Sequence, residues 1–379
     1  MLIESTYKAA KSVALIAENY FADYLKDALK RGETDLADVP SAAYIEAILD
    51  TAFWASLRRE EGNSPKISIA FLSPDQTDSA LRFETKLSFN ATVLTKLGPG
   101  VERQGIHLGV WYDSNGLFIW GTTRKIPNSC FVLDVSEPGL LVVKHRRKNG
   151  FGKFTNIMVL IGDQIKVIDE SSAKLPDCPT LLTSLLGFAS ASEDKSVNVL
   201  IQLATSMRAH KHGGTLLVVP SGSESWRNSI LKPMNYAVLP DFSGLSSLMR
   251  EDQSKWKSSQ WLTELSREIE SIAGLTAIDG ATVITDKHQV LAFGVKIGNL
   301  DGSSRVEKVL LTEPIIGGEG KVVNPASSGG TRHISAAQFV FDQRDAIALV
   351  ASQDGHFTIF TWSPCENLVH AHRIDSLLL

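Results

Sequence analysis

The sequence predicts an α+β N-terminal domain followed by an α/β domain with a mixed central sheet flanked by helices. Three observations predict this fold. Two segments with helical apolar spacing open the chain, short strand-like segments with turn residues follow to about residue 170, and from residue 197 helical and strand-like segments alternate. The 379 residues exceed one typical domain, and 43% hydrophobic with 21% charged residues describe a globular protein.

The first domain is predicted over residues 1–170. Helices are expected at 5–31, where Gly32 follows as a stop, and at 41–57. Strands of an antiparallel sheet are expected at 66–72, 109–112, 117–121, 131–135, 139–145 and 157–161. The basic run 144–148 precedes Asn149-Gly150 and indicates a hairpin tip rather than a phosphate-binding patch.

A polar segment at 171–182, which contains Pro176 and Pro179, is the predicted linker. The second domain is predicted over 183–363, with 364–379 as a C-terminal tail. Helices are expected at 197–209 and 261–273, and strands at 215–220, 281–285, 289–295, 346–351 and 356–362. A Ser-, Trp- and Lys-rich insertion fills residues 221–260.

The overall charge pattern bears on partners and location. The formal net charge of −4 gives no general basic field, so nucleic acid is not an expected partner. No basic-then-apolar leader and no long apolar run occur, so we expect a cytoplasmic protein without membrane contact. Cys130, Cys178 and Cys365 lack the paired spacing of a zinc or redox site, which predicts reduced thiols.

Several patterns favour a structural reading over a functional one. His210-Lys211-His212 precedes two glycines and fits a helix end better than a metal half-site. Trp226, Trp256 and Trp261 are more typical of local packing than of a base-stacking platform. Neither a nucleophile elbow nor a Walker-type phosphate loop is present in the sequence.

Two short strings suggest nucleotide chemistry. Ile278-Asp279-Gly280-Ala281 places a carboxylate beside a glycine that lets a ligand approach the backbone, although Asp-Gly is also a common turn. Gly329-Gly330-Thr331-Arg332-His333 offers a hydroxyl, a guanidinium and an imidazole, all suited to phosphate oxygens. We expect the second string to open the final strand region.

These strings, with Gly213–Val219 upstream, resemble the diadenylate cyclase (DAC) family, whose members join two ATP molecules into cyclic di-AMP. The family's Asp-Gly-Ala motif is matched at 279–281, and its Gly-Thr-Arg-His motif at 330–333. Ile334 stands where the family has a second arginine. Ser352-Gln353-Asp354 is similar to the family's Ser-Glu-Glu ending, with the acidic pair changed. The resemblance covers about residues 183–363.

The first domain resembles the DACNV-like sensor domain that precedes the cyclase in one branch of this family. The residues that carry this likeness are Phe53-Trp54-Ala55-Ser56-Leu57, Glu60-Glu61-Gly62, Ile106-His107-Leu108-Gly109-Val110 and Ile119-Trp120-Gly121. No ligand of this domain is indicated by the sequence.

The resemblance implies roles for particular residues. Asp279, Arg332 and His333 would be catalytic, and Mg²⁺ or Mn²⁺ would be bound by Asp279 and Asp354. Nucleotide-binding residues would be Gly280, Ala281, Gly330, Thr331 and Ser352. Because each ATP attacks the other, the resemblance also implies a homodimer or higher homo-oligomer with facing sites.

Two alternatives stay open. The same fold could serve as a catalytically weak or inactive adenine-nucleotide sensor, since Ile334 removes a charge-assisted contact worth about 1.5–3 kcal/mol. The first domain could instead be mainly an interaction module attached to a vestigial cyclase.

Overall fold

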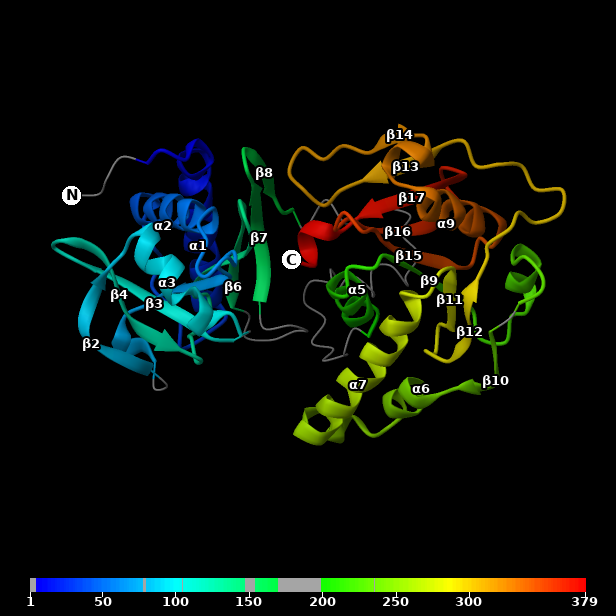
Figure 1. The fold of residues 1–379 in the computed structure, drawn as a ribbon, viewed down its shortest axis with the longest axis horizontal. Coiled ribbons are helices and arrows are strands. Elements are labelled where there is room, and N and C mark those ends of the chain that lie inside the picture. Colours follow the sequence, from blue (N-terminus) through cyan, green and yellow to red (C-terminus); the bar gives the residue numbers. More distant parts are fainter. Residues whose placement is uncertain (1–4, 78–79, 104, 147–153, 170–198, 235) are drawn as a thin grey trace. The chain divides into compact units, whose positions relative to one another are not determined.

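The computed structural model describes residues 5–77, 80–103, 105–146, 154–169, 199–234 and 236–379. These residues divide into two compact units. The first unit consists of the described residues up to Ile168 together with Leu379, and the second consists of Asp169 and residues 199–378. Each unit contains a mixed multi-strand sheet with helices (Figure 1). The predicted linker 171–182 lies outside the described residues.

The first unit is an eight-stranded sheet covered by helices. Its helices are α1 (Lys8–Lys30), α2 (Ala42–Ser56) and α3 (Ala91–Val101), with a 3-10 turn η1 (Pro74–Gln76). Its strands are β1 (Ile67–Phe71), β2 (Ala80–Ser88), β3 (His107–Asp113), β4 (Gly116–Thr123), β5 (Phe131–Glu137), β6 (Leu140–Arg146), β7 (Phe154–Ile161) and β8 (Gln164–Val167).

The strand order of the first sheet is β2-β4-β3-β1-β5-β6-β7-β8. Strands β1 and β3 are parallel, whereas the other pairs are antiparallel, so the predicted antiparallel sheet is in fact mixed. Alternate residues of β1 face opposite ways: Ile67 and Ile69 join the core under α1 and α2, and Ala70 joins a smaller cluster with Trp120.

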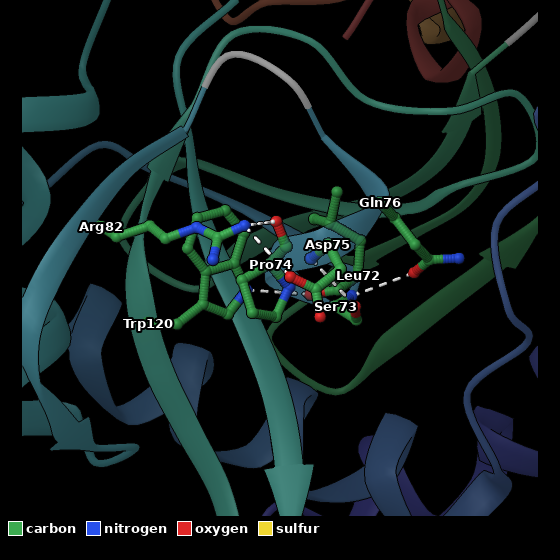
Figure 2. A network of polar contacts seen from close by, with 7 residues as sticks. All are labelled: Leu72, Ser73, Pro74, Asp75, Gln76, Arg82 and Trp120. Atoms are coloured by element: carbon green, nitrogen blue, oxygen red, sulfur yellow. Dashed lines mark hydrogen bonds and ion pairs between the residues drawn. The ribbon is translucent and has the colours of Figure 1, made fainter.

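Trp120 anchors the loop that follows β1. Its ring lies over Gly109, where a β-carbon would overlap the indole, and its Nε1 donates a hydrogen bond to the Leu72 carbonyl at 2.9 Å. Figure 2 shows how Arg82 then contacts the carbonyl of Pro74 at 2.6 Å and the carboxylate of Asp75 at 3.2 Å. The sensor-like motif residues thus have a structural role at this point.

The predicted hairpin between residues 139 and 161 is present, because β6 pairs with β7 in antiparallel register. The basic run is only partly exposed, however. His145 is buried, and Lys144 forms an ion pair with Asp134 at 2.8 Å. Residues 147 and 148 lie outside the described residues.

The second unit is a nine-stranded mixed sheet. Its helices are α5 (Val199–Ala209), α6 (Gly244–Met249), α7 (Ser259–Thr276), α8 (Pro325–Ser328) and α9 (Thr331–Asp342), with 3-10 turns η2 (Ser225–Ser229), η3 (Gln253–Lys257) and η4 (Asp375–Leu377). Its strands are β9 (Gly214–Val219), β10 (Ala237–Phe242), β11 (Ala281–Thr285), β12 (Val290–Val295), β13 (Val309–Thr312), β14 (Lys321–Val323), β15 (Ile347–Ala351), β16 (Phe357–Ser363) and β17 (Leu368–Arg373).

The second sheet has helices on both faces, in the strand order β10-β12-β11-β9-β15-β16-β17-β13-β14. Along β9, Leu216 and Val218 pack toward α5 and α7, whereas Leu217 and Val219 pack toward α9. A strand buried on both faces reads as a continuous apolar run, which is what Leu216–Val219 shows. Figure 1 shows α5 and α7 on one side of this sheet and α9 on the other.

Two predictions for the second unit are wrong. The string 329–333 opens helix α9 rather than the final strand region, because His333, Ala336, Ala337 and Val340 recur at helical spacing and are all buried. Residues 364–379 are not a simple tail, since β17 lies inside the sheet between β16 and β13. Thr312 contacts the buried His372 at 2.7 Å, which lets this polar strand lie inside.

Candidate functional site

Three chain segments meet at one edge of the second sheet. Ala281 at the start of β11 pairs with Thr215 at the start of β9, and Gly214 pairs with Ala351 at the end of β15. The segment before β11, the segment before β9 and the turn after β15 therefore emerge side by side. This register places Asp279, Gly213 and Ser352 at the same edge.

Arg332 reaches this edge from helix α9, which covers the face of the sheet opposite α5 and α7. Gly330 is the N-cap of α9, so Arg332 lies in the first turn of that helix. A β-carbon on Gly213 would lie 3.0 Å from Arg332 Nη1 and 3.3 Å from the Ala351 carbonyl oxygen. The guanidinium therefore lies across Gly213, against the end of β15. The structure brings Arg332 close enough to Asp279 for its charge to act on that carboxylate.

Asp279 forms an ion pair with Lys296, the residue after β12, at 2.5 Å between Nζ and Oδ2. The hydrogen bond from Lys296 and its charge, followed by the charge of Arg332, hold the pKa of Asp279 below its ordinary value. The Asp279 side chain is 89% exposed and that of Lys296 54% exposed, so this pair adds little to stability. Asp279 is thus an exposed, ionised carboxylate paired with Lys296, and the more distant charge of Arg332 also acts on it.

Lys296 was not identified from the sequence. Its position follows from strand pairing, because Val295 lies opposite Ala281 across the β11–β12 pair. The sequence signal that could have identified Lys296 is a lysine directly after the strand that follows the Asp-Gly-Ala string.

Gly280 allows the close approach of two backbone segments. Its φ is +120°, and a β-carbon there would lie 2.5 Å from the Gly294 carbonyl carbon and 2.8 Å from the Val295 oxygen. Only glycine fits such a position without displacing the neighbouring strand. Ala281 is buried in the sheet beyond it, so its side chain packs in the core.

His333 is buried inside the second unit, whereas we expected its imidazole to contact phosphate. The residue is 2% exposed, its ring stacks back over Gly329, and its Nε2 lies 3.3 Å from Thr358 Oγ1. Its ring also meets Phe360 edge-on at 5.8 Å between centroids. His333 therefore positions the first turn of α9, which carries Thr331 and Arg332.

Burial, with smaller contributions from the charges of Arg373, His356 and Arg332, lowers the pKa of His333 to about 4. The pKa of His333 is lower in the folded chain than in the unfolded chain. The contribution of the neutral imidazole to stability is therefore complete above about pH 6.5 and is lost progressively as the pH falls to about 4. The loss over this range amounts to about 3 kcal/mol.

We predict that His333→Gln removes this pH dependence. Unfolding by urea at pH 7 and pH 4.5 should show a smaller loss of free energy of unfolding in the variant than in the native chain. His372 is also buried, with its pKa lowered to about 3, and is common to both proteins. Equal losses in both proteins would rule out His333 as the titrating group.

Ser352 and Asp354 lie in the turn between β15 and β16. The Ser352 hydroxyl accepts a hydrogen bond from the His356 backbone N–H at 3.1 Å, so it already stabilises the turn. Asp354 is exposed in the same turn, and the neighbouring Gln353 side chain donates to the His212 carbonyl at 3.4 Å. The turn is therefore tied to the segment before β9.

The remaining candidates have structural environments. Helix α5 ends at Ala209, and His210 Nε2 lies 3.2 Å from Thr276 Oγ1, which supports the reading of this region as a helix end. Trp226 is buried, and Trp256 stacks on Trp261 with ring centroids 5.4 Å apart. These tryptophans pack locally, as predicted.

The donor set for a metal ion is small. Across the parts of the chain that the structure describes, no three His, Cys, Asp or Glu side chains are grouped to hold a metal ion. Mg²⁺ in phosphate-transfer sites commonly uses one or two carboxylates together with substrate phosphates. The exposed, ionised Asp279 fits that manner of binding.

Comparisons with known proteins bear mainly on the first unit. Residues 34–124 match the family model described as "Probable sensor domain DACNV". This agrees with the sensor-like motifs of the first unit. The match does not extend to residues 183–363, where the cyclase resemblance rests on motifs and their geometry. No curated protein matches the chain.

One similar solved structure is a hypothetical membrane spanning protein from Bacillus cereus. It is 15% identical, the alignment covers 46% of this chain and 61% of that chain, and the TM-score is 0.27. A likeness at this score supports no argument about the fold. Within the described residues, every helix is too short or too polar to cross a bilayer.

Proposed function

We propose that the second unit is a diadenylate cyclase, which condenses two ATP molecules into cyclic di-AMP and releases pyrophosphate. The observation that carries this proposal is the meeting of Asp279 and Arg332 at one sheet edge, from motifs about fifty residues apart. The sensor-domain match of residues 34–124 supports it independently, because such domains are associated with diadenylate cyclases.

The residues at the edge suit the triphosphate. Arg332 offers a charge-assisted donor fork, and Lys296, which is paired with Asp279, adds a second cation. Thr331 and Arg332 lie in the first turn of α9, where the backbone N–H groups point in the direction that favours anions. Together these groups would offset the charge that develops on the departing pyrophosphate.

Asp279 would orient the attacking group. In the reaction, the 3′-oxygen of one ATP forms a bond to the α-phosphorus of the other and its proton passes to solvent water, while the bond from the α-phosphorus to the bridging oxygen of the β-phosphate breaks and pyrophosphate leaves. The Asp279 carboxylate would accept the hydrogen bond of that 3′-hydroxyl, since its lowered pKa keeps it ionised. Its low basicity makes orientation, rather than proton storage, its main contribution.

Mg²⁺ or Mn²⁺ would be held by Asp279 and the substrate phosphates, and would supply neutralisation of phosphate charge. Asp354 is proposed as a second carboxylate for the same ion. Because one chain carries one such site, two chains must face one another for both bonds to form. We therefore propose a homodimer or a higher homo-oligomer as the active form. A cytoplasmic location and regulation by the first unit are part of the same proposal.

A second candidate is a catalytically weak or inactive adenine-nucleotide sensor. The ion pair between Lys296 and Asp279 favours it, because a lysine on the carboxylate competes with a divalent cation. Ile334 favours it too, because it supplies no charge where the family has an arginine.

Incubation of the purified chain with ATP and either Mg²⁺ or Mn²⁺, followed by chromatography, tests the proposal. Cyclic di-AMP as product is the expected result. ATP that binds but stays unreacted with both metals would identify the sensor instead. If the chain binds no adenine nucleotide, both candidates fail, which leaves the first unit as an interaction module beside a vestigial cyclase.

A further inference from the structure

The insertion at 221–260 brings an aromatic side chain to the sheet edge just described. Tyr236 precedes β10, the strand at one end of the nine-stranded sheet, and is 50% exposed. A half-exposed aromatic ring beside a polar site is a surface that favours an apolar ligand group.

Backbone and ring contacts fix the place of Tyr236. Its carbonyl accepts a hydrogen bond from the Phe293 N–H at 3.1 Å, and the next residue, Ala237, pairs with Ala292 of β12. Its ring is stacked with Phe293, with 5.0 Å between centroids and 7° between planes. The ring is therefore held in one orientation while half of the residue stays open to solvent.

A continuous set of contacts joins this ring to Asp279. A β-carbon on Gly294 would lie 2.9 Å from Tyr236 Cδ2 and 3.5 Å from Ile278 Cγ2. A β-carbon on Gly280 would lie 2.5 Å from the Gly294 carbonyl carbon. Tyr236, Gly294 and the Ile278–Gly280 segment therefore lie against one another, so the aromatic ring packs beside the segment that carries Asp279.

We propose that Tyr236 is a base-stacking residue that recognises the purine of the nucleotide bound at this edge. The inference rests on the proposed nucleotide site. A nucleotide joins an anionic triphosphate to a flat aromatic base, and this edge offers cations beside an ordered aromatic ring. Stacking of a base on an aromatic side chain strengthens binding and does not require hydrogen bonds to the edge of the base. The insertion thus contributes directly to ligand selection.

Titration of the full chain with ATP and with inorganic triphosphate separates the base from the phosphates. Tyr236→Ala is expected to weaken ATP binding about tenfold and to leave triphosphate binding unchanged. Tyr236→Phe keeps the ring and should bind ATP within about twofold of the native chain. Leu239→Ala, an exposed apolar residue of β10 in the same insertion, is the matched control and should bind both ligands normally.

Unchanged ATP affinity in Tyr236→Ala, or equal weakening toward ATP and triphosphate, would overturn the inference. Equal weakening would show that Tyr236 only supports the local fold. The native chain tests the proposed nucleotide site separately. If it binds neither ATP nor triphosphate, both the nucleotide site and the role of Tyr236 are wrong.

Discussion

Asp279→Ala is expected to lower the rate of cyclic di-AMP synthesis about a hundred- to a thousandfold, because it removes the carboxylate that orients the attacking hydroxyl. The carboxylate is paired with Lys296 and is placed to accept a hydrogen bond from the attacking hydroxyl. Because its side chain is exposed and makes no core contact, the fold should be unchanged. Initial rates of product formation, with circular dichroism as a check of folding, measure both expectations.

Asp301→Ala is the matched control for this substitution. Asp301 is an exposed carboxylate in the turn after β12 and lies outside the proposed site. It should retain the native rate. Native turnover in Asp279→Ala would show that Asp279 has no catalytic role, whatever the fate of the ATP site.

Gly280→Ala is expected to destabilise the second unit by about 2–4 kcal/mol, since it adds an overlap to a strained backbone conformation. The added methyl group would meet the backbone of Gly294 and Val295, which no rotation of a side chain relieves. Separation of β12 from the start of β11 would also displace Lys296 from Asp279. The free energy of unfolding in urea measures the effect.

Gly274→Ala provides the comparison within the same unit. Gly274 lies in helix α7, and a β-carbon there would meet nothing within 4 Å. Alanine is the better helix former, so stability should stay the same or rise by about 0.5–1 kcal/mol. If the two alanine variants have equal stability, the close approach at Gly280 is not a constraint on the fold.

Local patterns predicted most long elements of this chain. The apolar spacing of α1 and α7 and the continuous apolar run of β9 identify their elements because each depends on neighbours in sequence. Helix α9 was missed because two glycines and a polar string precede its apolar residues, which obscured the helical period. Strand β17 was missed because its polar residue His372 is buried against Thr312 and Thr361 of other strands.

The candidate site divides in the same way. Asp279 and Arg332 were identified from motifs, and the structure brings them to one edge. Lys296 and Tyr236 reach that edge only through strand pairing and the path of an insertion, which are tertiary features without a local pattern. The buried place of His333 likewise depends on how α9 packs on β16, so the sequence predicted its proximity but not its orientation.

The affinity of ATP for Arg332→Met tests most directly whether the two motifs form one nucleotide site. Loss of a charge-assisted contact of about 1.5–3 kcal/mol should weaken binding about ten- to a hundredfold in isothermal titration. Arg305→Met, which removes an exposed arginine from the segment between β12 and β13, should bind ATP like the native chain. Equal ATP affinity in Arg332→Met, Arg305→Met and the native chain would contradict the account.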